Sequence, residues 1–107
     1  MKFKTGSAQI TGTDSEETLE AVRSVLTAHS EIKKVRVEGH TDNRGAAKMN
    51  QKLSAARAAS VVKWLVAHGI KADRLTSQGF GFERPLVPND SDEGRTKNRR
   101  VEFHIQP

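Results

Sequence analysis

Residues 48–68 read KMNQKLSAARAASVVKWLVAH, and this stretch decides the fold that we expect for the chain. Its apolar side chains recur at the three- and four-residue steps that place them on one side of an α-helix. Gly69 follows directly, and glycine is typical of the position just after a helix end. The spacing therefore predicts one long helix over residues 48–68. Its apolar positions are Met49, Leu53, Ala56, Val61, Val62, Leu65 and Val66.

Two further elements are predicted upstream of this helix. Asp14 stands three residues ahead of Glu17, as in a capping box, and apolar residues follow at helical spacing, which predicts a helix over residues 15–29. In residues 34–38 valines alternate with charged residues, a period of two that is typical of a half-buried strand. We expect this strand to end at Gly39-His40.

The segment after the long helix is less regular. Residues 74–78 are a short strand candidate, and the two glycines of Gly79-Phe80-Gly81-Phe82 indicate a turn, a bulge or the close approach of another segment. Residues 85–92, with two prolines and a polar run, predict a solvated loop. A basic segment from Arg95 to Arg100 follows this loop.

The two ends of the chain supply the remaining strands. Val101, Phe103 and Ile105 alternate with polar residues as a last strand, and residues 2–4 are a short first strand. The predicted order is βαβαββ. Helices that alternate with strands predict an α/β (α+β) sandwich, in which both main helices pack on one face of a mixed sheet.

Length and composition limit the functional classes. The 107 residues fit a single domain over 1–107, and the formal charge of +5 favours an anionic partner such as nucleic acid, lipid headgroups or an envelope polymer. Cysteine is absent, so disulfides and thiolate metal sites are excluded. The first residues contain no apolar leader segment. We therefore expect either a cytosolic protein or a domain excised from a longer one.

A polar stripe interrupts the long helix. Asn50, Ser54 and Arg57 are four and three residues apart, so their side chains share one helix face. Thr41-Asp42 comes shortly before the helix. A carboxylate at the mouth of the helix and a guanidinium further along the same face would form a short groove with both signs of charge. Such a groove suits a zwitterionic ligand.

Two separated blocks of sequence stand out. The first is Glu38 to Asp42 with Gly45, Asn50, Leu53-Ser54 and Arg57-Ala58, and the second is Glu93 to Arg95 with Asn98 to Glu102. In this order the blocks resemble the signature of the OmpA C-terminal-like family of peptidoglycan-binding domains, which includes porin tails, the peptidoglycan-associated lipoprotein and the periplasmic domain of the flagellar stator. The resemblance covers nearly the whole chain.

The resemblance implies non-covalent, non-catalytic binding of the peptidoglycan stem peptide through diaminopimelate, without a cofactor. Asp42 would accept hydrogen bonds from the ligand ammonium, and Arg57 would donate a bidentate pair to its carboxylate. Many relatives have an acidic residue or asparagine where Gly6 stands, so that position would contribute backbone only. The implied ligand-binding residues are Asp42, Arg57, Asn50, Leu53, Thr5, Gly6 and Ser7, with Asn98, Arg99 and Arg100 as further candidates.

The resemblance also implies a location. The parent protein would lie in the periplasm, tethered to the outer or inner membrane through a segment that is not part of this sequence. A homodimer is an open alternative, and the sequence offers no exposed apolar stripe as its interface.

Each selected residue also has a purely structural interpretation. Asp42 could cap a turn or the following helix, and Arg57 could pair with it in a structural salt bridge. Ser54 is interpreted as a structural hydroxyl rather than a nucleophile. Asn98 to Arg100 are interpreted as structural residues or as a rim of positive charge.

Three other functions are weighed against peptidoglycan binding. His40-Thr41-Asp42 fits no familiar zinc spacing, and a triad with Ser54 lacks a nucleophile elbow, so we expect neither a metal nor catalysis. Phe80 and Phe82 beside the basic segment could stack on single-stranded nucleic acid. The low aromatic content of 5% and the lack of an RNP pattern oppose this alternative.

Overall fold

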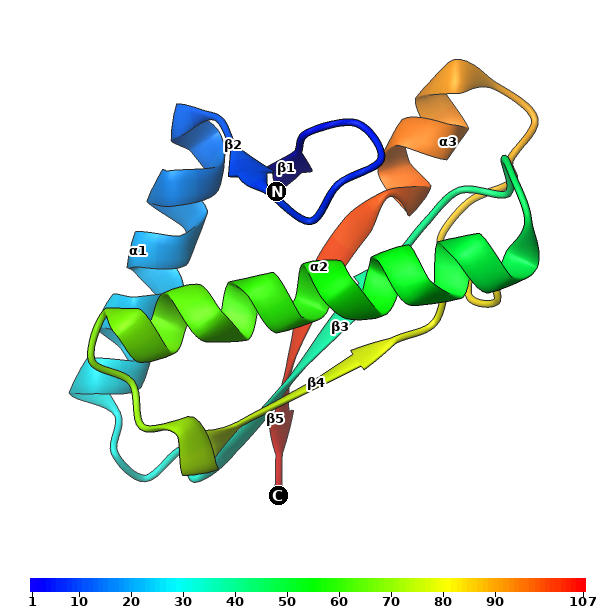
Figure 1. Ribbon diagram of the computed structural model, residues 1–107. Helices are drawn as coiled ribbons and strands as arrows, with labels where there is room; N and C mark the ends of the chain where they lie inside the picture. Colours follow the sequence, from blue (N-terminus) through cyan, green and yellow to red (C-terminus); the bar gives the residue numbers. More distant parts are fainter.

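The computed structural model describes residues 1–107, and Figure 1 shows the arrangement of its elements. In chain order these are β1 (Lys2–Phe3), β2 (Ile10–Thr11), α1 (Thr13–Ala28), β3 (Lys34–His40), α2 (Ala47–Ala67), the 3₁₀ turn η1 (Ala72–Arg74), β4 (Leu75–Gly79), α3 (Asp92–Asn98) and β5 (Arg100–Gln106).

The main sheet has three strands in the order β4-β3-β5. Strand β3 runs parallel to β4 and antiparallel to β5, so the sheet is mixed. Helices α1 and α2 cover one face of this sheet (Figure 1). The predicted mixed α/β sandwich with both main helices on one face is confirmed, and α2 begins and ends one residue earlier than predicted. None of the helices combines the length and the apolar character that crossing a bilayer would require.

The core lies between the two helices and the sheet. It is built from the apolar stripe of α2, the facing side of α1 and the inward valines of β3, as the periodicity predicts. Its buried members are Leu19, Leu26, Val35, Val37, Ala58, Val61, Leu65, Ile70 and Leu75.

Helix α2 approaches the sheet most closely at two glycines. A Cβ at Gly39 would lie 2.9 Å from the carbonyl carbon of Ser54, and one at Gly79 would lie 2.6 Å from the Cα of Ala55. Both distances are shorter than any normal Cβ contact, so only glycine permits this spacing. Gly81 adopts a φ of +56° in the turn that follows β4. The expectation of close approach and a turn around Gly79 and Gly81 is met.

The N-terminal strand does not join the main sheet. Residues 2–3 pair instead with residues 10–11 in a separate antiparallel hairpin. Ser15 anchors this hairpin, because its buried Oγ accepts a hydrogen bond of 2.6 Å from the Lys2 amide. The predicted capping box is therefore wrong: α1 begins at Thr13 after Gly12, without a side-chain cap.

Helix α3 corrects the expectation of a loop leading into a basic segment. Its N-cap is Ser91, whose Oγ accepts a 3.0 Å hydrogen bond from the Gly94 amide. Acidic residues occupy its first turn and basic residues its last, and these charges stabilise the helix by interacting favourably with its dipole. The helix has seven residues and no apolar periodicity, so the pattern that identified the other helices could not reveal it.

Candidate ligand-binding groove

A groove of about 830 Å³ lies between the β1–β2 hairpin, the first turns of α2 and the junction of α3 with β5. The resemblance selected ten residues, and two of them, Ser7 and Asn98, do not line this groove. The eight that do are Thr5, Gly6, Asp42, Asn50, Leu53, Arg57, Arg99 and Arg100. The structure thus brings Asp42 and Arg57 to the walls of one cavity.

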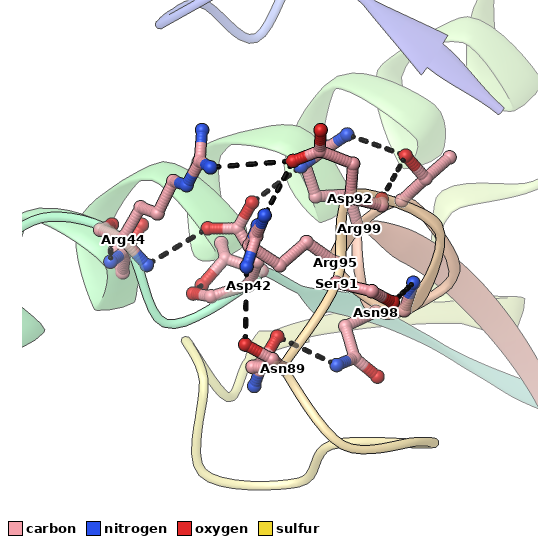
Figure 2. Close-up of polar contacts among 12 residues, drawn as sticks. Asp42, Arg44, Asn89, Ser91, Asp92, Arg95, Asn98 and Arg99 are labelled. Carbon is pink, nitrogen blue, oxygen red and sulfur yellow. Dashed lines mark hydrogen bonds and ion pairs between the residues drawn. The ribbon is translucent and has the colours of Figure 1, made fainter.

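Asp42 stands just beyond the end of β3 and is 6% exposed. Its Oδ1 accepts a 3.0 Å hydrogen bond from the Arg44 amide, and its Oδ2 is paired with Arg99 Nη1 at 2.5 Å (Figure 2). Arg99 also donates to Thr96 Oγ1 at 2.9 Å. The salt-bridge partner of Asp42 is therefore Arg99, whereas the structural alternative weighed from sequence assigned that pairing to Arg57.

Arg57 extends from α2 beneath the N-terminal hairpin. Its Nε donates a 2.9 Å hydrogen bond to the Ser7 carbonyl, and its Cζ lies 4.9 Å from the centroid of the Phe3 ring. Burial lowers the pKa of Arg57, the nearby Arg99 lowers it further, and Asp42 opposes both effects. Since a guanidinium stays charged in proteins, the groove holds a partly desolvated cation without a carboxylate in ion-pair contact.

The other polar residues of the stripe hold the groove in shape. Asn50 Nδ2 donates to the Arg44 carbonyl at 2.7 Å and so fixes the loop that carries Asp42. Ser54 is 1% exposed, and its Oγ donates to the Gln51 carbonyl and accepts from the Gly81 amide, both at 2.9 Å. The interpretation of Ser54 as a structural hydroxyl agrees with these contacts.

The hairpin forms the opposite wall. Thr5 and Gly6 line the groove, and Gly6 has a φ of +67°, a conformation that glycine adopts without strain. This backbone conformation explains why a residue without a side chain stands at this position. Ser7 acts through its carbonyl, which holds Arg57 in place.

Asn98 and Arg100 connect α3 to β5. Asn98 is fully buried; its Oδ1 accepts from the Leu86 and Val87 amides, and its Nδ2 donates to the Val87 carbonyl and to Asn89 Oδ1 (Figure 2 shows the Asn89 contact). This is the structural role considered for Asn98. Arg100 lines the groove and donates to Glu102 Oε2 at 2.5 Å.

Charge in the groove is unbalanced. Lys2, Arg57, Lys97, Arg99 and Arg100 line it, against only two acidic side chains, Asp14 and Asp42. An anionic ligand, or a zwitterion with surplus negative charge, is therefore favoured over a cation.

The Phe80 ring is not an open stacking surface. Phe80 is 7% exposed, its ring stacks against His40 with centroids 5.3 Å apart, and the Arg84 Cζ lies 3.9 Å from its centroid. A ring enclosed on both faces offers no platform to a base. The nucleic-acid alternative gains no support from this contact set.

Comparison with known proteins identifies relatives of this chain. Outer membrane protein Omp38 of Acinetobacter baumannii is 51% identical over 67 residues, which cover 62% of this chain and 19% of Omp38. Peptidoglycan-binding protein ArfA of Mycobacterium tuberculosis is 43% identical over 72 residues, which cover 67% of this chain and 22% of ArfA. The chain thus spans about a fifth of the length of each.

A solved structure shares the fold. The cell wall anchor of the T6SS from Pseudomonas aeruginosa superposes with a TM-score of 0.81 and 36% sequence identity, over 94% of this chain and 71% of the anchor. The family model described as "OmpA family" matches residues 2–99. With its fold, its two sequence blocks and these matches, the chain belongs to the OmpA family.

Proposed function

We propose that this domain binds peptidoglycan non-covalently and that the groove receives the side chain of diaminopimelate in the stem peptide. The observation that carries the proposal is that Asp42 and Arg57, the two charges selected from sequence, line the same groove. The end of a diaminopimelate side chain bears an ammonium and a carboxylate. The ammonium would contact Asp42 and the carboxylate would contact Arg57.

The cost of burying charge supports a ligand that carries both signs. A charge-assisted hydrogen bond contributes about 1.5–3 kcal/mol, whereas a buried charge without a partner costs about 3–5 kcal/mol. Arg57 has no carboxylate partner within the protein, so a ligand carboxylate would satisfy it. The excess of basic side chains in the groove favours the same group.

Arg99 adds a condition to this binding mode. It is paired with Asp42, so the ligand ammonium must share the carboxylate with it or displace it. The Arg99 side chain is 43% exposed, which leaves it free to move. Once displaced, it would face the ligand carboxylate together with Arg57.

The names of the relatives support a role in the cell envelope. One is a peptidoglycan-binding protein, one is an outer membrane protein and one is a cell wall anchor. We propose that the domain acts in the periplasm and anchors a larger protein, tethered to the outer or inner membrane, to the cell wall. Self-association of that protein is compatible with this role, and analytical ultracentrifugation tests it.

Co-sedimentation with insoluble peptidoglycan tests the proposed function. We expect Asp42→Ala and Arg57→Ala each to weaken binding about ten- to a hundredfold, which is the loss of one charge-assisted contact. Arg57→Lys should weaken binding too, because an ammonium cannot form the bidentate pair. Arg23→Ala, which removes a surface arginine paired with Glu20, is the matched control and should bind normally.

The two variants must also be shown to fold, by circular dichroism and thermal unfolding. Folded Asp42→Ala and Arg57→Ala proteins that still sediment with the wild-type affinity would contradict the proposal. Equal loss in the Arg23→Ala control would indicate general attraction of a basic protein to an anionic polymer.

A further inference from the structure

The sequence contains the same five-residue pattern twice. Residues 36–40 read RVEGH and residues 100–104 read RVEFH. The first copy lies on β3 and the second on β5, which pair in antiparallel register with Glu38 opposite Glu102. Each histidine then lies opposite the arginine of the other copy. The two copies are thus related by the approximate twofold symmetry of the strand pair.

This cluster lies on the sheet face away from α1 and α2. Val35 and Val37 point into the core, and side chains alternate along a strand, so Glu38 points to the other face. The face is a separate surface from the core and meets the ligand-binding groove only at its end, where His40 and Arg100 contribute to both.

The donor atoms of the cluster converge. One oxygen of Glu38, one of Glu102 and a ring nitrogen of His104 lie within 4.8 Å of one another. His104 Nε2 lies 2.8 Å from Glu102 Oε1 and 3.4 Å from Glu38 Oε1. A tetrahedral zinc ion with ligand bonds of about 2.0–2.1 Å separates its donors by about 3.3 Å. The distances in the cluster bracket that value.

His40 is placed to supply a fourth donor. Its Nε2 lies 3.3 Å from Glu38 Oε1 and 3.7 Å from Glu102 Oε2. The residue is 3% exposed and its Nδ1 has no hydrogen-bond partner, so its only polar contacts are those made by Nε2 within the cluster. The buried imidazole therefore presents Nε2, the nitrogen that could bind an ion, to the two carboxylates.

The arginines hold the carboxylates in orientation. Arg36 Nε donates to Glu38 Oε2 at 2.8 Å, and Arg100 Nε donates to Glu102 Oε2 at 2.5 Å. The Oε1 atoms of both glutamates are thereby left on the side of His104. Hydrogen bonds to the second oxygen of a ligating carboxylate are a usual feature of protein metal sites.

We propose that Glu38, Glu102 and His104, with His40 as fourth donor, form a Zn²⁺ site. Imidazole and carboxylate ligands suit zinc, and the imidazoles disfavour Mg²⁺ and Ca²⁺, which prefer oxygen. An ion can reach the site, because the side chains of His104 and Glu102 are 41% and 31% exposed. From sequence spacing we expected no metal, because His40 was compared only with its neighbours in the chain. The pairing of β3 with β5, which brings the other donors close, does not show in that spacing.

Calorimetric titration of the untagged protein with ZnCl₂ near pH 7.5 tests the proposal. We expect saturable binding of one zinc ion, with no comparable signal from MgCl₂. His104→Gln should weaken zinc binding at least tenfold. His29→Gln is the matched control: His29 is also a surface histidine beside a glutamate, Glu31, and its loss should change nothing.

The proposal would be overturned by the absence of saturable zinc binding to the wild-type protein, or by equal zinc affinity in wild type and His104→Gln. NMR of the wild type gives a reading that needs no variant, since zinc should shift the ring signals of His40 and His104 and leave those of His29 in place. Zinc-induced shifts confined to His29 or His68 would equally refute the site. Peptidoglycan co-sedimentation of His104→Gln should be normal, which separates this inference from the proposed function.

Discussion

Gly39→Ala tests whether the close contact between α2 and the sheet determines the structure. The added Cβ would lie 2.9 Å from the Ser54 carbonyl carbon and 3.3 Å from its Cα, and nearer still to its oxygen. All three neighbours are backbone atoms of α2, so no side-chain rotation can relieve the clash. Gly39 does not have a positive φ, so alanine introduces no dihedral strain and the effect is purely steric.

The expected magnitude follows from that geometry. Overpacking costs typically about 1–3 kcal/mol, and backbone neighbours place this site at the upper end, about 3 kcal/mol. For a domain of this size that loss lowers the unfolding midpoint by about 12 °C. Gly69→Ala is the control: a Cβ there meets nothing within 4 Å, but φ is +98°, so it should lose only about 1–2 kcal/mol through strain.

Thermal and urea unfolding followed by circular dichroism give both free energies. The reasoning is refuted if Gly39→Ala loses no more stability than Gly69→Ala, since steric contact would then matter less than backbone strain. A functional consequence should accompany the loss. As α2 moves away from β3, Arg57 shifts relative to Asp42, and peptidoglycan binding should weaken even at temperatures where the variant is folded.

Three further outcomes are expected. Asn98→Ala should lower the free energy of unfolding in urea by about 3 kcal/mol, because it removes a buried amide with four hydrogen bonds and leaves their backbone partners unsatisfied. A loss below about 1 kcal/mol would contradict this role. Arg74→Ala should lower the free energy of unfolding by about 2 kcal/mol, because the guanidinium donates to the carbonyl of Leu26 in the last turn of α1 and to those of His29 and Ile32 beyond it. Amide exchange should rise first in this segment. Burial, aided by the charge of Arg100, lowers the pKa of His40 below its ordinary value. The unfolded chain therefore binds more protons at this residue than the folded protein does, and the free energy of unfolding should fall as pH drops through about 6.5. His40→Gln should flatten that pH dependence of the unfolding free energy; an unchanged slope would refute the assignment.

The periodic elements were predictable because burial imposes their spacing. Strand β3, helix α2 and strand β5 each carry an apolar stripe that must face the core, and each lies within a residue or two of its predicted bounds. Helix α3 has no such stripe. It is held by the Ser91 cap and by the contacts of Asn98 with the preceding loop, and tertiary bonds of this kind leave no period in the sequence.

Contacts in the candidate site could be predicted between residues of the same helix or strand. Contacts between different elements could not. Asn50 and Arg57 share a face of α2, so their proximity followed from helical geometry. The pairing of Asp42 with Arg99 joins residues 57 positions apart and depends on the register of β3 against β5. The same register brings the two RVE-x-H copies together, although the repeat itself is visible in the sequence.

Titration with two synthetic stem peptides tests the central claim most directly. One contains diaminopimelate and the other has lysine in its place, so that only the carboxylate next to the ammonium differs. If Arg57 binds that carboxylate, the lysine peptide should bind the wild-type domain about ten- to a hundredfold more weakly than the diaminopimelate peptide. Arg57→Ala should remove this difference in affinity between the two peptides. Equal affinity of the wild-type domain for both peptides would contradict the account.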